Sequence, residues 1–254
     1  MRLVVIAWLA TGCLSRPSAI QSDAVTPPLA DAPRSSDGSS DGSAAQGVQL
    51  VQSVMLTFGG GDTTSARLPQ PIQPGDSLIA VATFDAQSAQ VTWSDSLGQS
   101  WTPVNTGFCS STGLAIGYLP DATDQATDLV TVSTNATEAI LGLGVYEFTG
   151  LGASLGSASQ CPALMSTDVS TPSLDTTQPA LLFAAFADSG SVLPYDVIPP
   201  FVIADVNSST YSYAAAYDAG GAKMGEQSGS YTATTTTPNM TDSWIGVIAA
   251  FAVP

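Results

Sequence analysis

Leu78-Ile79-Ala80-Val81-Ala82-Thr83-Phe84 is the stretch that decides the fold. It is almost wholly apolar, and it follows the turn residues Pro74-Gly75-Asp76 closely, which is typical of a buried β-strand. A similar stretch, Ala180-Leu181-Leu182-Phe183-Ala184-Ala185-Phe186, begins 102 residues later. Two similar segments at a long separation indicate an internal duplication.

Other segments repeat in the same order. Gly144-Val145 is echoed by Gly246-Val247, again 102 residues later, and Leu114-Ala115-Ile116-Gly117-Tyr118 is echoed by Tyr213-Ala214-Ala215-Ala216-Tyr217 at an offset of 99. The pattern predicts pseudo-repeats at about residues 75–150 and 178–254. Because each half has an incomplete apolar face, we expect the two to pack together. The expected fold is an antiparallel two-sheet sandwich, jelly-roll-like, over residues 47–254.

The rest of residues 47–254 favours the same all-β class. Short apolar segments alternate with turn residues, and no window of eleven or more residues has a convincing helical stripe. Trp93-Ser94-Asp95-Ser96-Leu97-Gly98-Gln99-Ser100-Trp101 places turn-forming residues between two segments with alternating apolar residues. This pattern predicts a tight β-hairpin.

Composition excludes several classes of function. The chain has no histidine, which rules out Ser–His–Asp and Cys–His catalysis and histidine metal sites. From residue 47 onward the basic residues are Arg67 and Lys223, against 17 acidic residues, for a net charge of −15. Binding to phosphates needs Lys and Arg, so nucleic acid and anionic lipid head groups are poor partners. The favoured role of the acidity itself is solubility alone.

The first residues have the order of an export signal. Met1-Arg2 is basic, and residues 3–10 are an apolar run too short to span a bilayer. The run leads into Leu9-Ala10-Thr11-Gly12-Cys13, which resembles the lipobox of bacterial lipoproteins. The resemblance implies a signal peptide over residues 1–12, lipidation of Cys13 and, since Leu14 follows it, release to the outer membrane of a Gram-negative cell. The alternative is an ordinary signal peptide that is cleaved later and removes Cys13.

Residues 13–46 are rich in Ser, Pro, Asp and Gly and contain few large apolar residues. Such a segment cannot bury enough surface to offset the entropy of ordering it. We expect an acylated, disordered linker that attaches a folded head to the membrane, facing the periplasm or the exterior.

Three features of the head resemble a β-sandwich module of bacterial surface and secreted proteins. They are Gly75-Asp76 with the strand that follows, the Ser94-Asp95-Ser96-Leu97-Gly98 turn with Trp101, and Tyr146-Glu147-Phe148-Thr149-Gly150. The similarity covers most of residues 47–254. It implies a fold but no agreed activity, because these motifs are turns and core positions.

Carboxylates are the first candidates for a site. Glu147 is the one acid that we expect within a strand, but the spacing places no second carboxylate near it, as glycoside hydrolysis would need. The alternative role for Glu147 is a rim carboxylate capped by backbone donors. Asp121, Asp124 and Asp128 fall within one loop and are candidate ligands for Ca²⁺, or else they are solvated turn residues.

Tyrosines offer a second candidate. Tyr211, Tyr213 and Tyr217 share one face of a predicted strand, as in the aromatic platform of a carbohydrate-binding module. However, Tyr213 and Tyr217 align with Leu114 and Tyr118 of the first half, which favours core packing instead.

The cysteines predict a disulfide. Lipidation uses Cys13 and leaves Cys109 and Cys161 as a pair in a chain that matures outside the cytosol, where disulfides persist. The bond would hold the Gly- and Ser-rich connection between the halves, over residues 150–166, to the first half. The alternative is two buried free thiols.

Together these patterns predict a non-enzymatic, surface-exposed binding or adhesion module of the outer membrane. Its expected partners are the lipid bilayer and a polysaccharide or an envelope protein. No cofactor is expected, with Ca²⁺ as the alternative. The alternatives are a structural component of the envelope or matrix and a carbohydrate-active enzyme.

Overall fold

The computed structural model describes residues 47–253, with gaps at 58–59, 86–87, 124–128, 136–139, 162–165, 189–195, 198–200, 208–211, 219–228 and 242–243. All of the regular secondary structure in these residues is β-strand, which confirms the all-β class. The described residues contain no helix with the length and apolar character needed to cross a membrane.

The strands follow the chain from β1 to β18. They are β1 (Gln49–Thr57), β2 (Thr63–Ala66), β3 (Ser77–Asp85), β4 (Val91–Asp95), β5 (Thr102–Cys109), β6 (Thr112–Leu119), β7 (Val130–Thr134), β8 (Ile140–Thr149), β9 (Ser154–Gln160), β10 (Ser166–Ser170), β11 (Leu174–Thr176), β12 (Ala180–Asp188), β13 (Asp196–Val197), β14 (Val202–Asn207), β15 (Ser212–Asp218), β16 (Gly229–Tyr231), β17 (Thr234–Thr241) and β18 (Trp244–Ala252).

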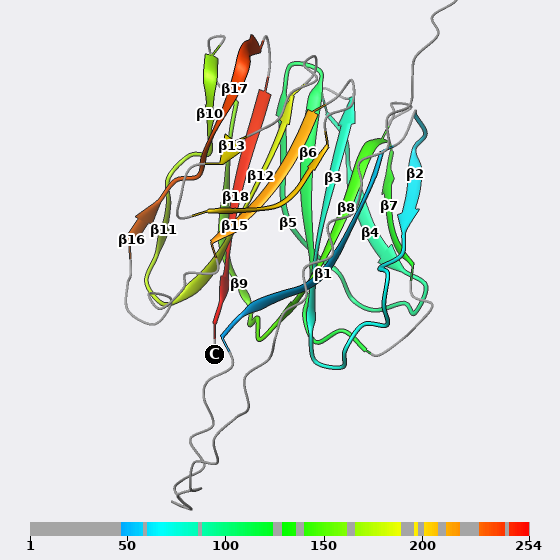
Figure 1. The fold of residues 1–254 in the computed structure, drawn as a ribbon. Helices are drawn as coiled ribbons and strands as arrows, with labels where there is room; N and C mark the ends of the chain where they lie inside the picture. The colour runs from blue at the N-terminus through cyan, green and yellow to red at the C-terminus, as the bar shows by residue number, and fades with distance from the viewer. Residues whose placement is uncertain are drawn as a thin grey trace, which may run out of the picture. The chain divides into compact units, whose positions relative to one another are not determined.

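All strand pairings are antiparallel. The first five-stranded sheet has the order β1-β8-β3-β6-β5, and the second has the order β14-β15-β12-β18-β9. The first three-stranded sheet is β2-β7-β4, the second is β10-β17-β13, and β11 pairs with β16. Figure 1 shows the two five-stranded sheets between the second three-stranded sheet at the left and the first at the right.

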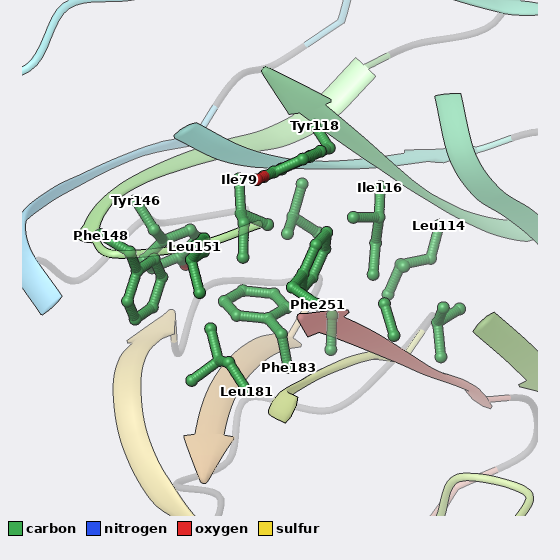
Figure 2. Close-up of a cluster of buried hydrophobic side chains, with 14 of the residues drawn as sticks. Ile79, Leu114, Ile116, Tyr118, Tyr146, Phe148, Leu151, Leu181, Phe183 and Phe251 are labelled. Carbon is green, nitrogen blue, oxygen red and sulfur yellow. The ribbon is translucent and has the colours of Figure 1, made fainter. Parts of the chain in front are cut away.

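The central core lies between the two five-stranded sheets. Ile79 and Ile116 of the first sheet pack with Phe183 and Phe251 of the second, and all four are fully buried (Figure 2). The Tyr118 ring lies 4.7 Å from the Phe251 ring, measured between centroids. The two sheets are therefore joined by a continuous apolar layer, which confirms the predicted antiparallel sandwich.

Each five-stranded sheet also has a second buried face. In β3, Leu78 and Phe84 point away from the central core and pack with Trp93 of the first three-stranded sheet. In β12, Phe186 packs in the same way with Val169 of the second three-stranded sheet. Both faces of β3 and β12 are buried away from water. Their sequences are therefore continuously apolar and do not alternate between apolar and polar residues. The sandwich consequently has two outer layers in addition to the two sheets expected from the sequence.

The two halves of the chain share a strand order. We align the strands β1 to β8 of the first half, in that order, with β9, β10, β12, β13, β14, β15, β17 and β18 of the second half. In this alignment the two five-stranded sheets have the same strand order, and so do the two three-stranded sheets. The predicted offset of 102 residues relates β3 to β12 correctly, because the corresponding residues Ile79 and Leu181 both face the central core. It fails for the last strands, because Val247 faces that core whereas Val145 faces the first three-stranded sheet.

The predicted hairpin of residues 93–101 is wrong. β4 pairs with β7 and β5 pairs with β6, so this segment crosses from one sheet to another instead of joining two paired strands. The Trp93 and Trp101 rings stack with their centroids 6.1 Å apart, both in the layer between the two sheets. Trp93 is buried and Trp101 is partly buried against the same apolar cluster, which accounts for the apolar alternation that resembled a hairpin.

The predicted disulfide is confirmed. Cys109 ends β5 and Cys161 follows β9, with their Cα atoms 5.1 Å apart. The segment before Cys161 was expected to be a loose connection, but it contains β9, which pairs with β18 as the edge strand of the second five-stranded sheet. The bond therefore joins the facing edges of the two five-stranded sheets.

Candidate functional site

A pair of buried carboxyl groups, Asp76 and Glu147, lies at one end of the first five-stranded sheet. Glu147 occupies the middle of a cross-strand row, with Gln52 of β1 on one side and Leu78 of β3 on the other. Asp76 is only two residues before Leu78, so the register of β3 on β8 brings the two acids together. Glu147 has no exposed surface, and Asp76 is 7% exposed.

Glu147 accepts hydrogen bonds at both carboxylate oxygens. The backbone N–H of Gln73 donates to Oε1 at 2.7 Å, and Gln52 Nε2 donates to Oε2 at 2.5 Å. The same Gln52 amide binds the backbone of Gln70, where its Oε1 accepts from the N–H at 2.8 Å and its Nε2 donates to the carbonyl at 3.1 Å. The carboxylate is thus capped by a backbone donor, but it is fully enclosed instead of lying at a rim.

Asp76 completes the pair from the turn that begins β3. Burial raises the pKa of Asp76 to about 6, and its hydrogen bond to Glu147 and the negative charge of Glu147 add to the rise. Its Oδ2 is buried and has no hydrogen-bonding partner among the described residues. The Asp76 carboxyl group therefore keeps its proton under mildly acidic conditions.

The expectation that Glu147 has no carboxylate neighbour is thus wrong. The two acids are 71 residues apart in the chain, and only the pairing of β3 with β8 brings them together. The signal in the sequence is the acid of Pro74-Gly75-Asp76, immediately before a strand that pairs with the strand of Glu147.

The turn of Asp76 is fastened to the loop after β6. Gly75 N–H donates to the Ala122 carbonyl at 3.1 Å, and Ala122 N–H donates to the Asp76 carbonyl at 2.7 Å. Nearby, the Tyr118 hydroxyl donates to the Gly152 carbonyl at 2.6 Å. Burial raises the pKa of Tyr118, a hydrogen bond with Ser77 opposes the rise, and the negative charge of Asp121 adds to it. These polar groups fix the ends of β3 and β6.

A second region is the outer surface of the first three-stranded sheet, which we call the hydroxyl face. The register places six Ser and Thr residues in two rows across the three strands. The rows are Thr63, Ser133 and Thr92, and Ser65, Thr131 and Ser94. Thr63 Oγ1 donates to Ser133 Oγ at 3.1 Å, and Ser65 Oγ lies 2.7 Å from Thr131 Oγ1 in a second hydrogen bond.

Strand alternation explains this surface. Ala66, Trp93, Val130 and Val132 are buried and point into the layer below. Each strand therefore turns its Ser and Thr residues outward, and all six are partly or fully exposed. Ladder geometry spaces the hydroxyls by about 4.8 Å across strands and about 6.7 Å along them. The result is a regular and uncharged array.

The structure places the other predicted site residues as follows. Cys13, Asp124, Asp128 and Tyr211 lie outside the described residues. Asp121 is exposed and has a positive φ of 48° in the loop after β6. The described part of the chain contains no cluster of three or more acidic, His or Cys residues arranged to hold a metal.

Tyr213 and Tyr217 lie in β15, where their backbones pair with those of Ala187 and Phe183. Their side chains are outside the described part of the structure, so the aromatic platform and the core packing remain alternative predictions. The hydroxyl face was not predicted, although the sequences Thr63-Thr64-Ser65, Thr92-Trp93-Ser94 and Thr131-Val132-Ser133 carry its signal.

Comparison with protein-family models, curated proteins and solved structures finds no match for this chain. The resemblance to lipoproteins and to a surface β-sandwich module therefore stays a prediction from the sequence.

Proposed function

We propose that the protein is a non-enzymatic binding module that is anchored to the bacterial outer membrane through lipidated Cys13 and holds a neutral polysaccharide on its hydroxyl face. The observation that supports the ligand is the array itself, with six outward hydroxyls in two regular rows and no charged side chain among them. The lipobox-like sequence at Cys13 supports the anchor.

The chemistry of the face suits a polyhydroxylated polymer. Ser and Thr hydroxyls both donate and accept hydrogen bonds, as sugar hydroxyls do, and their protons rotate to fit either role. The net charge of −15 over residues 47–254 would repel an anionic polymer, which favours a neutral one. Single contacts of this kind are weak, so a repeating ligand that several tethered copies bind together gains by avidity.

The proposed linker gives the head room to reach a ligand. Residues 13–46 comprise 34 residues. A flexible chain of that length has a root-mean-square end-to-end distance of about 30 Å. The head could therefore reach ligands within a distance of this order from its anchor.

The environment of the carboxyl pair argues against glycoside hydrolysis by Asp76 and Glu147. Asp76 and Glu147 are the paired acids that glycoside hydrolysis would require, but Glu147 is fully enclosed and both of its oxygens accept hydrogen bonds from the protein. A substrate would have no access to the fully enclosed carboxylate.

A structural role in the envelope is the second candidate. It is favoured by the edge strands β1 and β14, which contact each other and expose Val51 (45%) and Val202 (55%). Exposed apolar residues on unpaired sheet edges are typical sites of association between chains. Concentration-dependent assembly of the purified protein would favour this role.

The binding proposal is tested with the mature chain in which Cys13→Ser removes the anchor. Neutral insoluble polysaccharides (cellulose, chitin and starch) should retain this protein, and the double substitution Thr131→Val with Ser133→Ala should weaken retention at least tenfold. Thr106→Val, on the exposed side of β5, is the matched control and should leave retention unchanged. Equal retention of the double variant, or no retention by any neutral polymer, contradicts the proposal.

A further inference from the structure

We infer that Arg67, at one end of the hydroxyl face, binds two hydroxyl oxygens on neighbouring ring carbons of one sugar unit and thereby selects which neutral polysaccharide the face holds. This inference rests on the proposed function, because it names the class of sugar that the same face binds. The expected ligands are polymers whose units keep such a pair of hydroxyls free, as the glucose units of cellulose and starch do.

The first argument is the position of Arg67. β2 ends at Ala66, but the alternation of its side chains continues, because Ala66 and Leu68 are buried in the apolar layer below and Arg67 between them is exposed. Arg67 therefore lies on the outward side, two residues beyond Ser65, which belongs to the second row of hydroxyls. The rise along a strand places its backbone about 6.7 Å from that row.

The opposite end of the hydroxyl face continues into two amide side chains. The Asn135 N–H donates to the Gln90 carbonyl at 3.2 Å, and the Gln90 N–H donates to Asn135 Oδ1 at 2.8 Å. Both residues lie two positions beyond the row of Thr63, Ser133 and Thr92, on the same outward side, and both are exposed. The outward surface is thus a strip that runs along the strands, with amides at one end, hydroxyls in the middle and a guanidinium at the other end.

The second argument is that the guanidinium is available for a ligand. Arg67 is the one basic residue in the described part of the chain, and it has no ion-pair partner there. A guanidinium carries five N–H donors in a planar fork and no acceptor. Two of these donors are parallel, so the fork fits two oxygen acceptors that lie side by side.

The surrounding charge decides which pair of oxygens the fork binds. A carboxylate would fit it, but residues 47–254 carry a net charge of −15, which repels an anionic polymer. An exposed ion pair in water contributes little to compensate for this repulsion. Two adjacent hydroxyl oxygens of a neutral sugar accept the same two hydrogen bonds and bring no further negative charge to the head.

Carbohydrate chemistry then separates the candidate polymers. Glucose units of cellulose and starch keep free hydroxyls on two neighbouring ring carbons. In chitin an acetamido group replaces one hydroxyl of that pair. In curdlan, a glucan linked through its third carbon, the linkage uses the middle ring hydroxyl, so that no two neighbours stay free. Neutral polymers with and without the pair are therefore at hand for a direct comparison.

Retention of the mature chain carrying Cys13→Ser on these four insoluble polymers tests the inference. We expect cellulose and starch to retain the protein more tightly than chitin and curdlan. Arg67→Lys keeps the positive charge but removes the fork, so it should weaken retention on cellulose and starch about tenfold and leave retention on chitin and curdlan unchanged. Sodium chloride should have little effect, because no ion pair with the ligand forms.

Controls separate this inference from the proposed function. Arg34→Lys, in the proposed linker, is the matched control and should behave like the parent protein. Equal retention of Arg67→Lys and the parent on cellulose and starch, or equal retention of the parent on all four polymers, overturns the inference. Retention that falls steeply with salt would assign an anionic group to Arg67 and contradict it as well. If the double substitution Thr131→Val with Ser133→Ala weakens retention and Arg67→Lys does not, the proposed function stands without this inference. No retention of the parent by any polymer contradicts both.

Discussion

The raised pKa of Asp76 predicts an unusual dependence of stability on pH. The pKa of Asp76 is raised from 3.8 to about 6, so the folded state holds a proton that the unfolded state releases. Asp76 should contribute its full stabilisation below pH 4 and lose about 3 kcal/mol as the pH rises to 6, because each pH unit in that window is worth about 1.4 kcal/mol. Urea unfolding between pH 4 and pH 8 measures the loss.

Asp76→Asn should remove this slope, because the amide donates to Glu147 at every pH. Asp62→Asn, at an exposed position, is the control and should retain the slope. A free energy of unfolding that rises between pH 4 and pH 6 in the wild-type protein would show that Asp76 does not hold a proton in the folded state.

Asp95 fixes the crossing between β4 and β5. Its Oδ1 accepts from the N–H groups of Leu97 and Gln99 at 2.9 and 3.0 Å, and its Oδ2 accepts from Trp101 Nε1 at 2.9 Å. Asp95→Ala leaves these donors without the carboxylate and should destabilise the protein by about 2–3 kcal/mol. Asp95→Asn retains an acceptor for the turn and should cost less. Denaturant unfolding followed by tryptophan fluorescence compares the two variants. Equal losses of unfolding free energy would show that the turn does not depend on a side-chain acceptor at position 95.

At the level of strands, the sequence predicts the elements better than their partners. The apolar run of residues 78–84 is β3, and its later echo is β12, because burial of both faces is visible as a lack of polar residues. The partner of a strand depends on long-range register. The pattern around Trp93 and Trp101 is satisfied equally by a hairpin and by a crossing between sheets, and only the pairing with β7 and β6 separates them.

The same limit explains what could be predicted of the candidate sites. Glu147 can be singled out from its strand, but its contact with Asp76 follows from the pairing of Leu78 with Glu147, which no local pattern specifies. The hydroxyl face requires three strands, separated in the chain, to be placed side by side in one register. The disulfide could be predicted from the cysteine count together with the expected export of the chain.

Glycine in β6 allows the first three-stranded sheet to approach closely. A Cβ atom on Gly117 would lie 2.6 Å from the Trp93 ring, which is buried between the layers and has no free end to move. Gly117→Ala should therefore cost about 1–3 kcal/mol through overpacking. Gly47→Ala, where a Cβ would meet nothing within 4 Å, is the control. Thermal unfolding of both variants is the measurement, and an unchanged Gly117→Ala melt would contradict the tight packing of these layers.

At the scale of the whole head, the contact between the halves has the pattern of a two-fold interface. The strand β5 of the first half lies against β9, and β1 lies against β14. In the alignment of the two halves, β9 is the equivalent of β1 and β14 is the equivalent of β5. The contact of β5 with β9 and the contact of β1 with β14 are therefore equivalent to each other. An interface in which equivalent surfaces contact each other reciprocally is typical of a symmetric dimer. The duplication stays a prediction, and superposing the halves of an experimental structure would test it.

The disulfide at the β5 and β9 edges should govern the stability of this assembly. A closed loop with a sequence separation of 52 residues contributes about 4 kcal/mol in the chain-entropy model. The double variant Cys109→Ala with Cys161→Ala should lose stability of that order. Because Phe183 and Phe251 of the second half pack against Ile79 and Tyr118 of the first, the variant should still unfold in one transition.

Calorimetry separates these effects. A lower melting temperature with a single transition is expected, since the halves share a core that neither can bury alone. Two resolved transitions in the variant would show that the bond, and not the central core, couples the halves. An unchanged melting temperature would show that the bond constrains the unfolded chain little. The bond closes edges that would otherwise be free to separate, so its removal should also speed proteolysis near β9 before the rest of the head unfolds.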